Sequence, residues 1–247
     1  MIHILLPAYN EERSITLLLD RIKQALKNFT GNYVVLVVDD GSTDTTKKVV
    51  EFLSNRLPVR IISHRSNQGL GAAMDTGLKE IMCTSSAEDI IVTMDADNTH
   101  DPALIQEMVN KINLGYDVII ASRYQKGGQE VGLSLRRKFF SKVVNVILKI
   151  IFPIIGAKDY TSGYRAYKGA RLKEAFSFYN GKLVEEKGFL CMAEILIKLR
   201  RLISLRVVEV PLVLRYDLKN TPSKMKVMRT ILRYLRMIGK GALAWRR

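Results

Sequence analysis

Two carboxylates, Asp95 and Asp97, stand two residues apart at the end of an apolar run, with Ala96 between them. If the chain stays extended here, both side chains point to the same face and can approach one ligand. Carboxylate oxygens suit Mg²⁺ or Mn²⁺, ions that usually keep water and take further oxygens from substrate phosphates. The alternative is a turn with helix-capping acids, because Asp101 and Pro102 follow with good N-cap chemistry. The pair therefore indicates either a divalent-metal site or a capped turn.

A second acidic segment combines two adjacent carboxylates, Asp39 and Asp40, with a glycine turn and a hydroxyl-rich stretch. One interpretation is a carboxylate that accepts hydrogen bonds from a nucleobase or ribose. The other is simply a well-formed strand-to-helix connection. Gly69 and Gly71 open a predicted helix farther along, but they do not match the dinucleotide-binding pattern G-x-G-x-x-G, because its third position holds Met74.

Short runs rich in Val and Ile predict buried strands at 2–6, 34–38, 60–63, 90–94 and 117–121, with a final strand at 207–214. Helical patterns alternate with the first five runs, at 14–29, 43–55, 72–82 and 102–114. This alternation predicts an α/β fold with a Rossmann-like, mostly parallel sheet and helices on both faces. Because such sheets bind ligands beyond the carboxyl ends of their strands, segments 7–11, 39–42 and 95–97 should face one crevice.

The charged residues are unevenly distributed along the chain. Residues 1–122 hold 11 Lys or Arg and 16 Asp or Glu (11 − 16 = −5), whereas residues 123–247 hold 28 and 8 (28 − 8 = +20). The basic second half indicates an anionic partner or a membrane surface.

With 47% hydrophobic and 26% charged residues, the composition is that of a folded domain rather than a disordered chain or a large membrane-embedded bundle. Cys83 and Cys191 have neither metal-ligand nor redox spacing, which favours two reduced thiols in a cytosolic protein.

Two segments of the basic half have the pattern of amphipathic helices. The longest apolar stretch, 139–156, is interrupted by polar residues, so we expect no membrane-spanning helix, and the short apolar start of the chain indicates no signal peptide. On the helix predicted from this stretch, the polar side would carry Lys142, Asn145 and Lys149. The apolar side would carry Val144, Ile147, Leu148 and Ile151.

The C-terminal tail repeats the pattern, with basic residues spaced by three and four at Lys226, Arg229, Arg233, Arg236 and Lys240. Both helices are predicted to lie on an anionic membrane surface. In one alternative, their apolar faces pack on the core and their basic faces meet water. In another, the charges bind nucleic acid, which we do not expect because the acidic half would repel phosphate.

The order of short motifs along nearly the whole chain resembles that of family 2 glycosyltransferases, in particular their polyprenol-phosphate, dolichol-phosphate mannosyltransferase-like group. The motifs that carry the resemblance are PAYNE at Pro7, VVDDGSTD at Val37, NQGLGAAMDTG at Asn67, MDADNTHDP at Met94, ASRY at Ala121, the Arg137-to-Ser141 and Asn145 pattern, DYTSGYRAY at Asp159, GF followed by Glu194, and VP at Val210 followed by Ser223-Lys224-Met225. The resemblance implies a GT-A type fold, followed here by C-terminal amphipathic helices.

The resemblance also implies roles for individual residues. Those that would bind the nucleotide sugar are Pro7, Tyr9, Glu11, Asp39, Asp40, Asp95, Ala96, Asp97, Arg123 and Lys224. Asp95 and Asp97 would hold Mg²⁺ or Mn²⁺, and Asp97 and Arg137 would be catalytic. Those that would bind the acceptor are Arg137, Ser141, Ser162 and Arg165.

Two positions depart from the family pattern. Thr99 stands where a third metal ligand, Gln, is found in the best-described members. The C-terminal pattern R-x-x-G-x-S-K keeps Ser223 and Lys224, but its Arg position falls on Leu218, and Lys219 and Arg215 are the two candidates to replace that arginine.

The resemblance implies a metal-dependent hexosyltransferase that moves a sugar, with inversion, from GDP-mannose or a UDP-hexose to a polyprenyl or dolichyl phosphate. Such an enzyme would work peripherally on the cytoplasmic face of a membrane, with or without a small membrane-anchoring subunit, and without nucleic acid. Alternatives are a family 2 transferase with a saccharide or other hydroxyl acceptor, and a non-catalytic nucleotide-sugar-binding protein. The expected domains are 1–217, with a nucleotide-sugar half 1–122 and an acceptor half 123–217, and a basic amphipathic segment 218–247.

Overall fold

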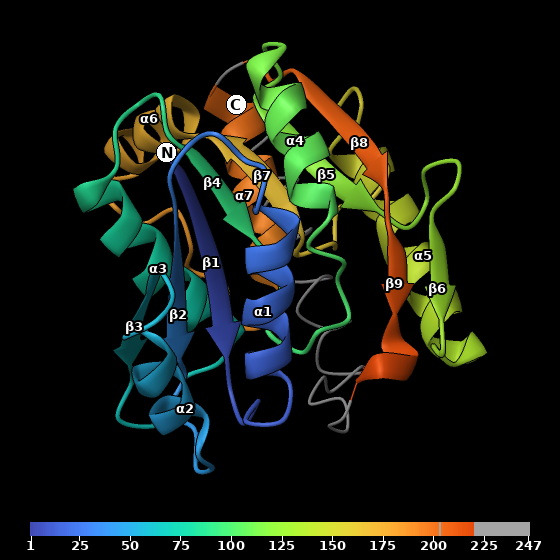
Figure 1. The fold of residues 1–247 in the computed structure, drawn as a ribbon. Coiled ribbons are helices and arrows are strands. Elements are labelled where there is room, and N and C mark those ends of the chain that lie inside the picture. Colours follow the sequence, from blue (N-terminus) through green and yellow to red (C-terminus); the bar gives the residue numbers. More distant parts are fainter. Residues whose placement is uncertain (203, 220–247) are drawn as a thin grey trace.

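The computed structural model describes residues 1–202 and 204–219. In this part of the chain, one mostly parallel sheet has the strand order β3-β2-β1-β4-β7-β5-β8 (Figure 1). Its strands are β1 (Ile2–Ala8), β2 (Tyr33–Asp39), β3 (Val59–Ser63), β4 (Ile90–Thr93), β5 (Val118–Ser122), β7 (Arg165–Lys168) and β8 (Val207–Pro211). Strand β7 runs antiparallel to both of its neighbours, β4 and β5, whereas the other pairings are parallel.

Helices cover both faces of the sheet, and each face has its own hydrophobic core. One core includes α1 (Ile15–Ala25), α2 (Thr46–Leu53) and α4 (Leu104–Asn113); α1 and α4 lie in front of the sheet in Figure 1. The other core includes α3 (Leu70–Thr84), α5 (Leu135–Ile151), α6 (Gly169–Phe178) and α7 (Leu190–Leu202). Because strand residues alternate between faces, Ile4 and Leu6 of β1 enter the first core and Leu5 enters the second.

The predicted α/β fold is confirmed, with differences at particular elements. The first five predicted strands and the four helices between them are present, with ends shifted by a few residues. Strand β7, helix α6 and most of helix α7 were not predicted. The single strand predicted at 207–214 is two strands, β8 and β9 (Val213–Arg215), because the chain leaves the main sheet after Pro211. The predicted domain boundaries remain predictions.

A short strap, defined here as residues 212–219, crosses from the main sheet to the loop after β4. Its strand β9 pairs in parallel with β6 (Gln129–Val131), and a single 3₁₀ turn, η1 (Tyr216–Leu218), follows. The backbone N–H of Arg215 donates to the carbonyl oxygen of Thr99 at 3.0 Å. Gly132, at φ +76°, packs so closely on the strap that a Cβ there would come within 2.6 Å of the backbone nitrogen of Asp217. The strap is therefore held on both sides.

Helix α5 packs its predicted apolar side on the protein core, which is the alternative that the sequence left open: Leu148 belongs to that core, and Val144 and Ile151 pack against it. One polar residue of the helix lies on the other side from the prediction. Asn145, expected on its outer side, is only 3% exposed and lies with Leu148 on the side that faces the core. Its amide donates to Thr161 Oγ1 at 3.0 Å, and its oxygen accepts the backbone N–H of Tyr160 at 2.6 Å. The prediction was wrong because these hydrogen bonds satisfy a polar group that the helical pattern assigns to solvent.

No helix within the described residues is long and apolar enough to cross a membrane. The amphipathic tail helix predicted at 226–240 lies outside the described residues, and so does Lys224.

Candidate functional site

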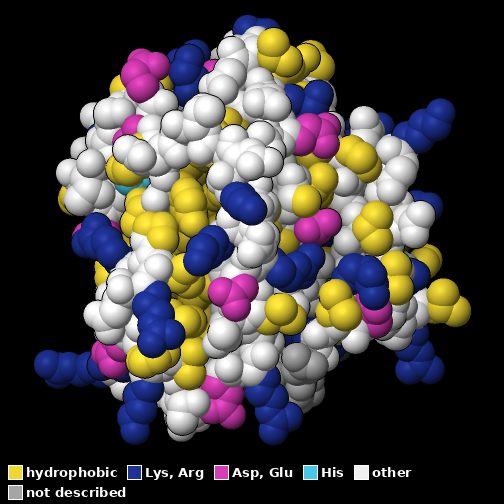
Figure 2. Space-filling view, in the orientation of Figure 1, with side chains coloured by type: hydrophobic (Ala, Val, Ile, Leu, Met, Phe, Trp, Pro, Cys, Tyr) yellow, Lys and Arg dark blue, Asp and Glu magenta, His cyan; other side chains and the backbone are white. Residues whose placement is uncertain are grey.

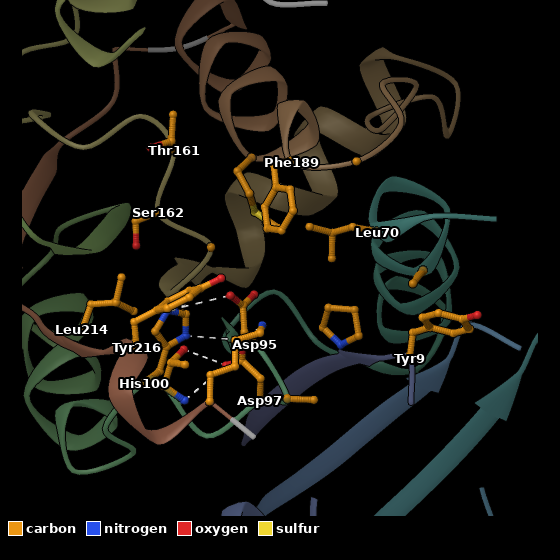
Figure 3. Close-up of a pocket in the computed structure, with 18 of the residues that line it drawn as sticks. Tyr9, Leu70, Asp95, Asp97, His100, Thr161, Ser162, Phe189, Leu214 and Tyr216 are labelled. Carbon is orange, nitrogen blue, oxygen red and sulfur yellow. Dashed lines mark hydrogen bonds and ion pairs between the residues drawn. The ribbon is translucent and has the colours of Figure 1, made fainter. Parts of the chain in front are cut away.

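A cavity of about 490 Å³ opens at the carboxyl ends of β1, β2 and β4, within the size range of small-molecule sites. As predicted, segments 7–11, 39–42 and 95–97 each contribute to it. Figure 3 shows Asp95 and Asp97 between Tyr9 on one side and His100 and Tyr216 on the other. The predicted site residues that line the cavity are Pro7, Tyr9, Glu11, Asp40, Asp95, Ala96, Asp97, Arg123, Arg137, Ser141 and Ser162. Asp39 and Arg165 are not among its lining residues, and the chemical roles of the others remain predictions.

The loop after β4 fixes the two aspartates. Asp97 Oδ1 accepts hydrogen bonds from Thr99, from its backbone N–H at 3.2 Å and its hydroxyl at 2.6 Å. Asp97 Oδ2 forms an ion pair with Nζ of Lys219, the last residue of the strap. The backbone N–H of Asp95 donates to His100 Nδ1 at 3.2 Å, so Nε2, 4.0 Å from Asp95 Oδ2, carries a ring proton. Thr99 thus orients Asp97 through its hydroxyl proton.

The two carboxyl groups differ in acidity. Burial raises the pKa of Asp95, and the charge of Asp97 adds to this effect while His100 opposes it. Burial also disfavours the charged form of Asp97, but the ammonium of Lys219 and the hydroxyl of Thr99 outweigh it and lower the pKa of Asp97. The charged, cation-paired state of Asp97 is therefore the stable one near neutral pH.

The donor set fits a divalent ion that shares its coordination with a ligand. Within the described residues, no group of three or more His, Cys, Asp or Glu side chains is arranged to hold a metal. Asp95 and Asp97 offer hard carboxylate oxygens in a cavity, and Asp97 already binds a cationic group. Magnesium and manganese commonly bind one or two carboxylates and complete their shell with water and phosphate oxygens. The pair therefore suits an ion whose remaining oxygens come from water and from a bound ligand.

Asp40 organises the loop that starts α3. Its Oδ1 accepts the backbone N–H of Gln68 at 2.9 Å, and its Oδ2 accepts that of Gly69 at 2.7 Å. His64 Nδ1 lies 2.7 Å from Oδ1. By contrast, Asp39 is 2% exposed and accepts the backbone N–H of Ser42 at 3.1 Å. Asp39 thus holds its own turn and does not line the cavity, and its predicted part in ligand binding remains a prediction.

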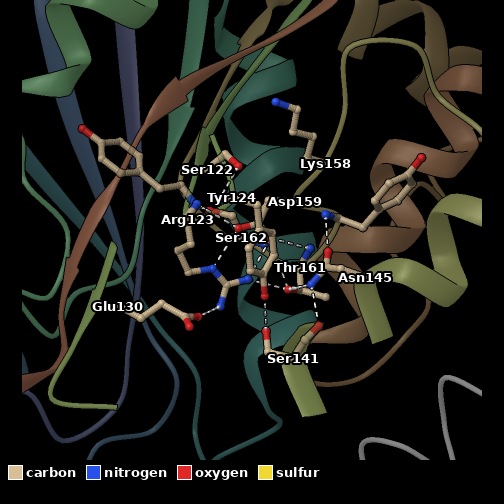
Figure 4. Close-up of polar contacts among 12 residues, drawn as sticks. Ser122, Arg123, Tyr124, Glu130, Ser141, Asn145, Lys158, Asp159, Thr161 and Ser162 are labelled. Atoms are coloured by element: carbon tan, nitrogen blue, oxygen red, sulfur yellow. Dashed lines mark hydrogen bonds and ion pairs between the residues drawn. The ribbon is translucent and has the colours of Figure 1, made fainter. Parts of the chain in front are cut away.

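Arg123 is bound into a buried network at the wall of the cavity (Figure 4). Its Nε and Nη2 donate to the two oxygens of Asp159 at 2.8 and 2.7 Å, and Nη1 lies 3.3 Å from Glu130 Oε1. Nη2 also donates to Thr161 Oγ1 at 2.7 Å. Although burial disfavours its charge, Asp159 raises the pKa of Arg123 above its usual range. Two carboxylates therefore neutralise a guanidinium that was predicted to meet phosphate, and Asp159 is a structural partner that the prediction missed.

The predicted acceptor residues separate into two groups. Arg137 of α5 donates from Nη1 to the hydroxyl oxygen of Tyr216 at 2.9 Å, and among the described residues it has no ion-pair partner. Ser141 Oγ lies 3.0 Å from the hydroxyl oxygen of Tyr124, and Ser162 donates to the carbonyl oxygen of Ala121 at 2.7 Å.

Arg165 does not join them. Its side chain is fully buried, and its guanidinium donates to the carbonyl oxygens of Met192 and Tyr160. Arg165 thus links β7 to Tyr160 and to α7, and its predicted role in binding the acceptor remains a prediction.

The cavity also contains residues that the sequence reading did not assign to it. Examples are His100, Thr161, Lys187, Phe189, Tyr216 and Lys219. Lys219 was named as one of two possible replacements for a missing arginine, and His100, Thr161 and Phe189 lie within motifs that carry the family resemblance, but no such signal in the sequence marked Lys187 or Tyr216. Tyr216 and Phe189 reach the cavity through the strap and the start of α7, whose placement depends on contacts between distant segments.

A model of glycosyl transferase family 2 matches residues 3–176 of the chain. Dolichol-phosphate mannosyltransferase of Pyrococcus furiosus is 35% identical over 238 residues, which cover 96% of this chain and 62% of that protein. Polyprenol monophosphomannose synthase of Mycolicibacterium smegmatis is 32% identical over 192 residues, which cover 75% of this chain and 67% of that protein. The chain thus spans less than two thirds of the length of the Pyrococcus relative.

Solved structures support the same grouping at the level of the fold. Glucosyl-3-phosphoglycerate synthase from Mycobacterium tuberculosis, in complex with phosphoglyceric acid, is similar with a TM-score of 0.70 at 20% identity, over 96% of this chain and 79% of that one. Its complex with Mn²⁺, UDP and glucosyl-3-phosphoglycerate gives a TM-score of 0.69 at 20% identity, over 100% and 79%. The sheet and its helices therefore have the GT-A-like fold expected from the sequence. With the family model covering most of its length, the chain belongs to glycosyl transferase family 2.

Proposed function

We propose that this chain is a hexosyltransferase that moves a sugar from a nucleoside diphosphate sugar to a polyprenyl phosphate, with inversion and with the help of Mg²⁺ or Mn²⁺. The observation that carries the proposal is the pairing, in one cavity, of the carboxylates Asp95 and Asp97 with the guanidinium of Arg137. The carboxylates suit a metal and a diphosphate, and the guanidinium suits a second phosphate. The names of the two mannosyl-transferring relatives support this choice of donor and acceptor.

On the donor side, the residues of the chain bind and orient the ligand. Asp95 and Asp97 would hold the divalent ion, which when bound neutralises charge on the departing nucleotide. Asp40 holds the 67–69 loop in place, and Pro7 and Tyr9 line the adjacent wall, where a base and ribose would lie. Lys219, which pairs with Asp97, adds a cation close to where the diphosphate would lie.

On the acceptor side, Arg137 provides a positive charge that no carboxylate within the described residues neutralises. Guanidinium groups bind phosphate oxygens in a fixed geometry. A phosphate monoester is already largely ionised near neutral pH, so it needs positioning more than a base. Held between Arg137 and the sugar, its oxygen can attack the anomeric carbon from the side opposite the departing diphosphate, which inverts the configuration.

We also propose that helix α5 brings the protein to the cytoplasmic face of a membrane. Phe140, Ser141 and Val144 of α5 line the cavity, whereas its outer side exposes Phe139 and Ile150 to 64% and 74%. The basic residues of the same helix are Arg136, Arg137, Lys138, Lys142 and Lys149. Figure 2 shows hydrophobic and basic side chains interspersed on the right of the molecule, where Figure 1 places α5. Apolar side chains among basic ones favour an anionic lipid surface, with or without a small anchoring subunit.

The test offers labelled GDP-mannose and UDP-hexoses with Mg²⁺ or Mn²⁺, and either a polyprenyl phosphate or soluble sugars. We expect the label to become extractable into organic solvent with one donor, and to stay aqueous when EDTA is present or the lipid is omitted. Transfer to a soluble saccharide, with no label in the lipid, would instead support a hydroxyl-acceptor transferase. Binding of the donor without any transfer would support a non-catalytic protein.

A further inference from the structure

Asp97 can offer only one of its two oxygens to a cation. Its Oδ1 accepts both hydrogen bonds from Thr99, at 3.2 and 2.6 Å. Its Oδ2 is paired with Nζ of Lys219. The ion pair is sheltered, since 14% of the Lys219 side chain and 8% of the Asp97 side chain are exposed. A divalent ion at Asp97 and the ammonium of Lys219 would therefore need the same oxygen.

The rest of the cavity offers a lone ion little to replace that oxygen. No group of three or more His, Cys, Asp or Glu side chains within residues 1–202 and 204–219 is arranged to hold a metal. With Lys219 in place, the carboxylate of Asp95 is the remaining charged ligand of the pair. An ion at the pair would then be bound by one carboxylate instead of two, with water in other positions of its shell.

The position of Lys219 is set by the strap, but its ammonium can move. The strap is fixed by the hydrogen bond from Arg215 N–H to Thr99 O at 3.0 Å and by its close packing on Gly132. The lysine side chain, in contrast, has a flexible four-carbon stem and carries its charge at the tip. Rotation about its bonds can take Nζ off Asp97 without moving the strap. A diphosphate in the cavity would offer the displaced ammonium new anionic oxygens.

We propose that Lys219 is a placeholder cation: it occupies the metal-binding oxygen of Asp97 until the diphosphate of the donor enters, and it thereby makes metal binding depend on the nucleotide. This inference rests on the proposed function, since it takes the donor to be a nucleoside diphosphate sugar. The dependence is reciprocal, because a nucleotide that strengthens metal binding is itself bound more tightly by the same factor when the metal is present. The chain would then rarely hold an ion without its substrate.

The experiment measures Mn²⁺ binding by the loss of the free-ion electron paramagnetic resonance signal, without nucleotide and with GDP or UDP. Lys219→Met removes the cation, and Lys219→Gln does so with a polar side chain. Without nucleotide, we expect both variants to bind Mn²⁺ about tenfold more tightly than wild type. The increase in Mn²⁺ affinity that the nucleotide causes should be about tenfold smaller in these variants than in wild type. Lys219→Arg keeps the charge and should resemble wild type. Lys126→Met removes an exposed lysine outside the cavity and controls for net charge.

The outcomes distinguish failure of the placeholder role of Lys219 from failure of the proposed function. If wild type binds Mn²⁺ well only with a nucleoside diphosphate but the Met and Gln variants gain nothing without it, the placeholder role is wrong and the proposed function stands. If no variant binds Mn²⁺ under any condition, both are overturned. A gain in Lys219→Met that disappears when Asp97→Asn is added supports competition at the Asp97 carboxylate. Circular dichroism spectra matching wild type establish that the variants are folded.

Discussion

The guanidinium of Arg137 donates to the hydroxyl oxygen of Tyr216 at 2.9 Å, which joins helix α5 to the strap across 79 residues of sequence. Because no carboxylate within the described residues pairs with Arg137, this bond is the main polar contact that orients it. Tyr216 is therefore a positioning residue for the proposed acceptor phosphate.

Replacement Tyr216→Phe removes the hydroxyl and keeps the ring. We expect KM for the lipid phosphate to rise about fivefold, the effect of one lost hydrogen bond of roughly 1 kcal/mol, with KM for the donor changed less. Steady-state kinetics with each substrate varied in turn measure the two constants. Tyr33→Phe, on β2 away from the cavity, is the control. An equal rise in both constants would contradict a role specific to the acceptor.

The close approach of Gly163 to Asp95 gives a second prediction. A Cβ on Gly163 would lie 3.3 Å from Asp95 Oδ1, a contact that requires the carboxylate to shift. Gly163→Ala should therefore weaken nucleotide binding in the presence of Mn²⁺ by several-fold and leave binding without the ion nearly unchanged. Calorimetric titration with and without EDTA makes the comparison. A melting temperature well below that of wild type would show that the substitution acts on folding instead.

The buried pair of Asp159 and Arg123 should matter for stability. Asp159→Asn keeps the shape but leaves the guanidinium without its main counter-charge, and breaking a buried pair in this way costs about 3 kcal/mol or more. Urea unfolding followed by circular dichroism measures the loss. Asp217→Asn, which breaks the exposed pair with Arg215, should change the free energy of unfolding little. Equal effects of the two substitutions would be inconsistent with the buried network.

Alkaline pH should unfold the protein through its buried tyrosines. Burial raises the pKa of Tyr160 to about 12, and the pKa values of Tyr164 and Tyr167 are raised for the same reason. A pKa that is higher in the folded state contributes stability below the unfolded value of about 10, and this contribution is lost as pH rises toward 12. Urea midpoints measured from pH 9 to 12 should fall. The slope should be shallower in Tyr160→Phe, and an unchanged slope would argue against this tyrosine.

The exposed side of α5 gives a test of the membrane proposal. Phe139→Glu with Ile150→Glu replaces two exposed apolar side chains by acids on a basic helix. Co-sedimentation with anionic liposomes should fall strongly, while activity on detergent-solubilised lipid is retained. Leu114→Glu, at an apolar residue 71% exposed just beyond α4, serves as the matched control. If wild type binds liposomes only when a membrane subunit is added, helix α5 is not what binds the membrane.

The parts of the fold that were predicted correctly depend on local patterns. Runs such as 34–38 are apolar on both faces and end in acids, so both the strand and the position of Asp40 follow from short stretches of sequence. The different placements of Asp39 and Asp40 depend on the residue at which β2 ends. Asp39 is the last residue of β2 and caps its own turn, whereas Asp40, one residue later, reaches the cavity.

The features that could not be predicted from the sequence depend on contacts with residues far away along the chain. Strand β7 enters the sheet between β4 and β5 against the parallel direction, and no local property of Arg165–Lys168 reveals this. Asn145 is buried because Tyr160 and Thr161 satisfy its amide. Arg123 appeared to be available for phosphate because its partner Asp159 lies 36 residues away. For Asn145 and Arg123, a polar group is satisfied by a segment that the pattern of its own element does not identify.

The contact between Asp97 and Lys219 also has a consequence for how the protein is made. The two residues are separated by 122 positions, and the strap that carries Lys219 comes after every strand of the main sheet. During synthesis, the ribosome therefore releases both aspartates long before the ammonium that covers one of them. A nascent chain could complete β1, β2 and β4 and still present an open pair of carboxylates to the ions around it. The donor side of the cavity is finished only when the end of the strap has emerged.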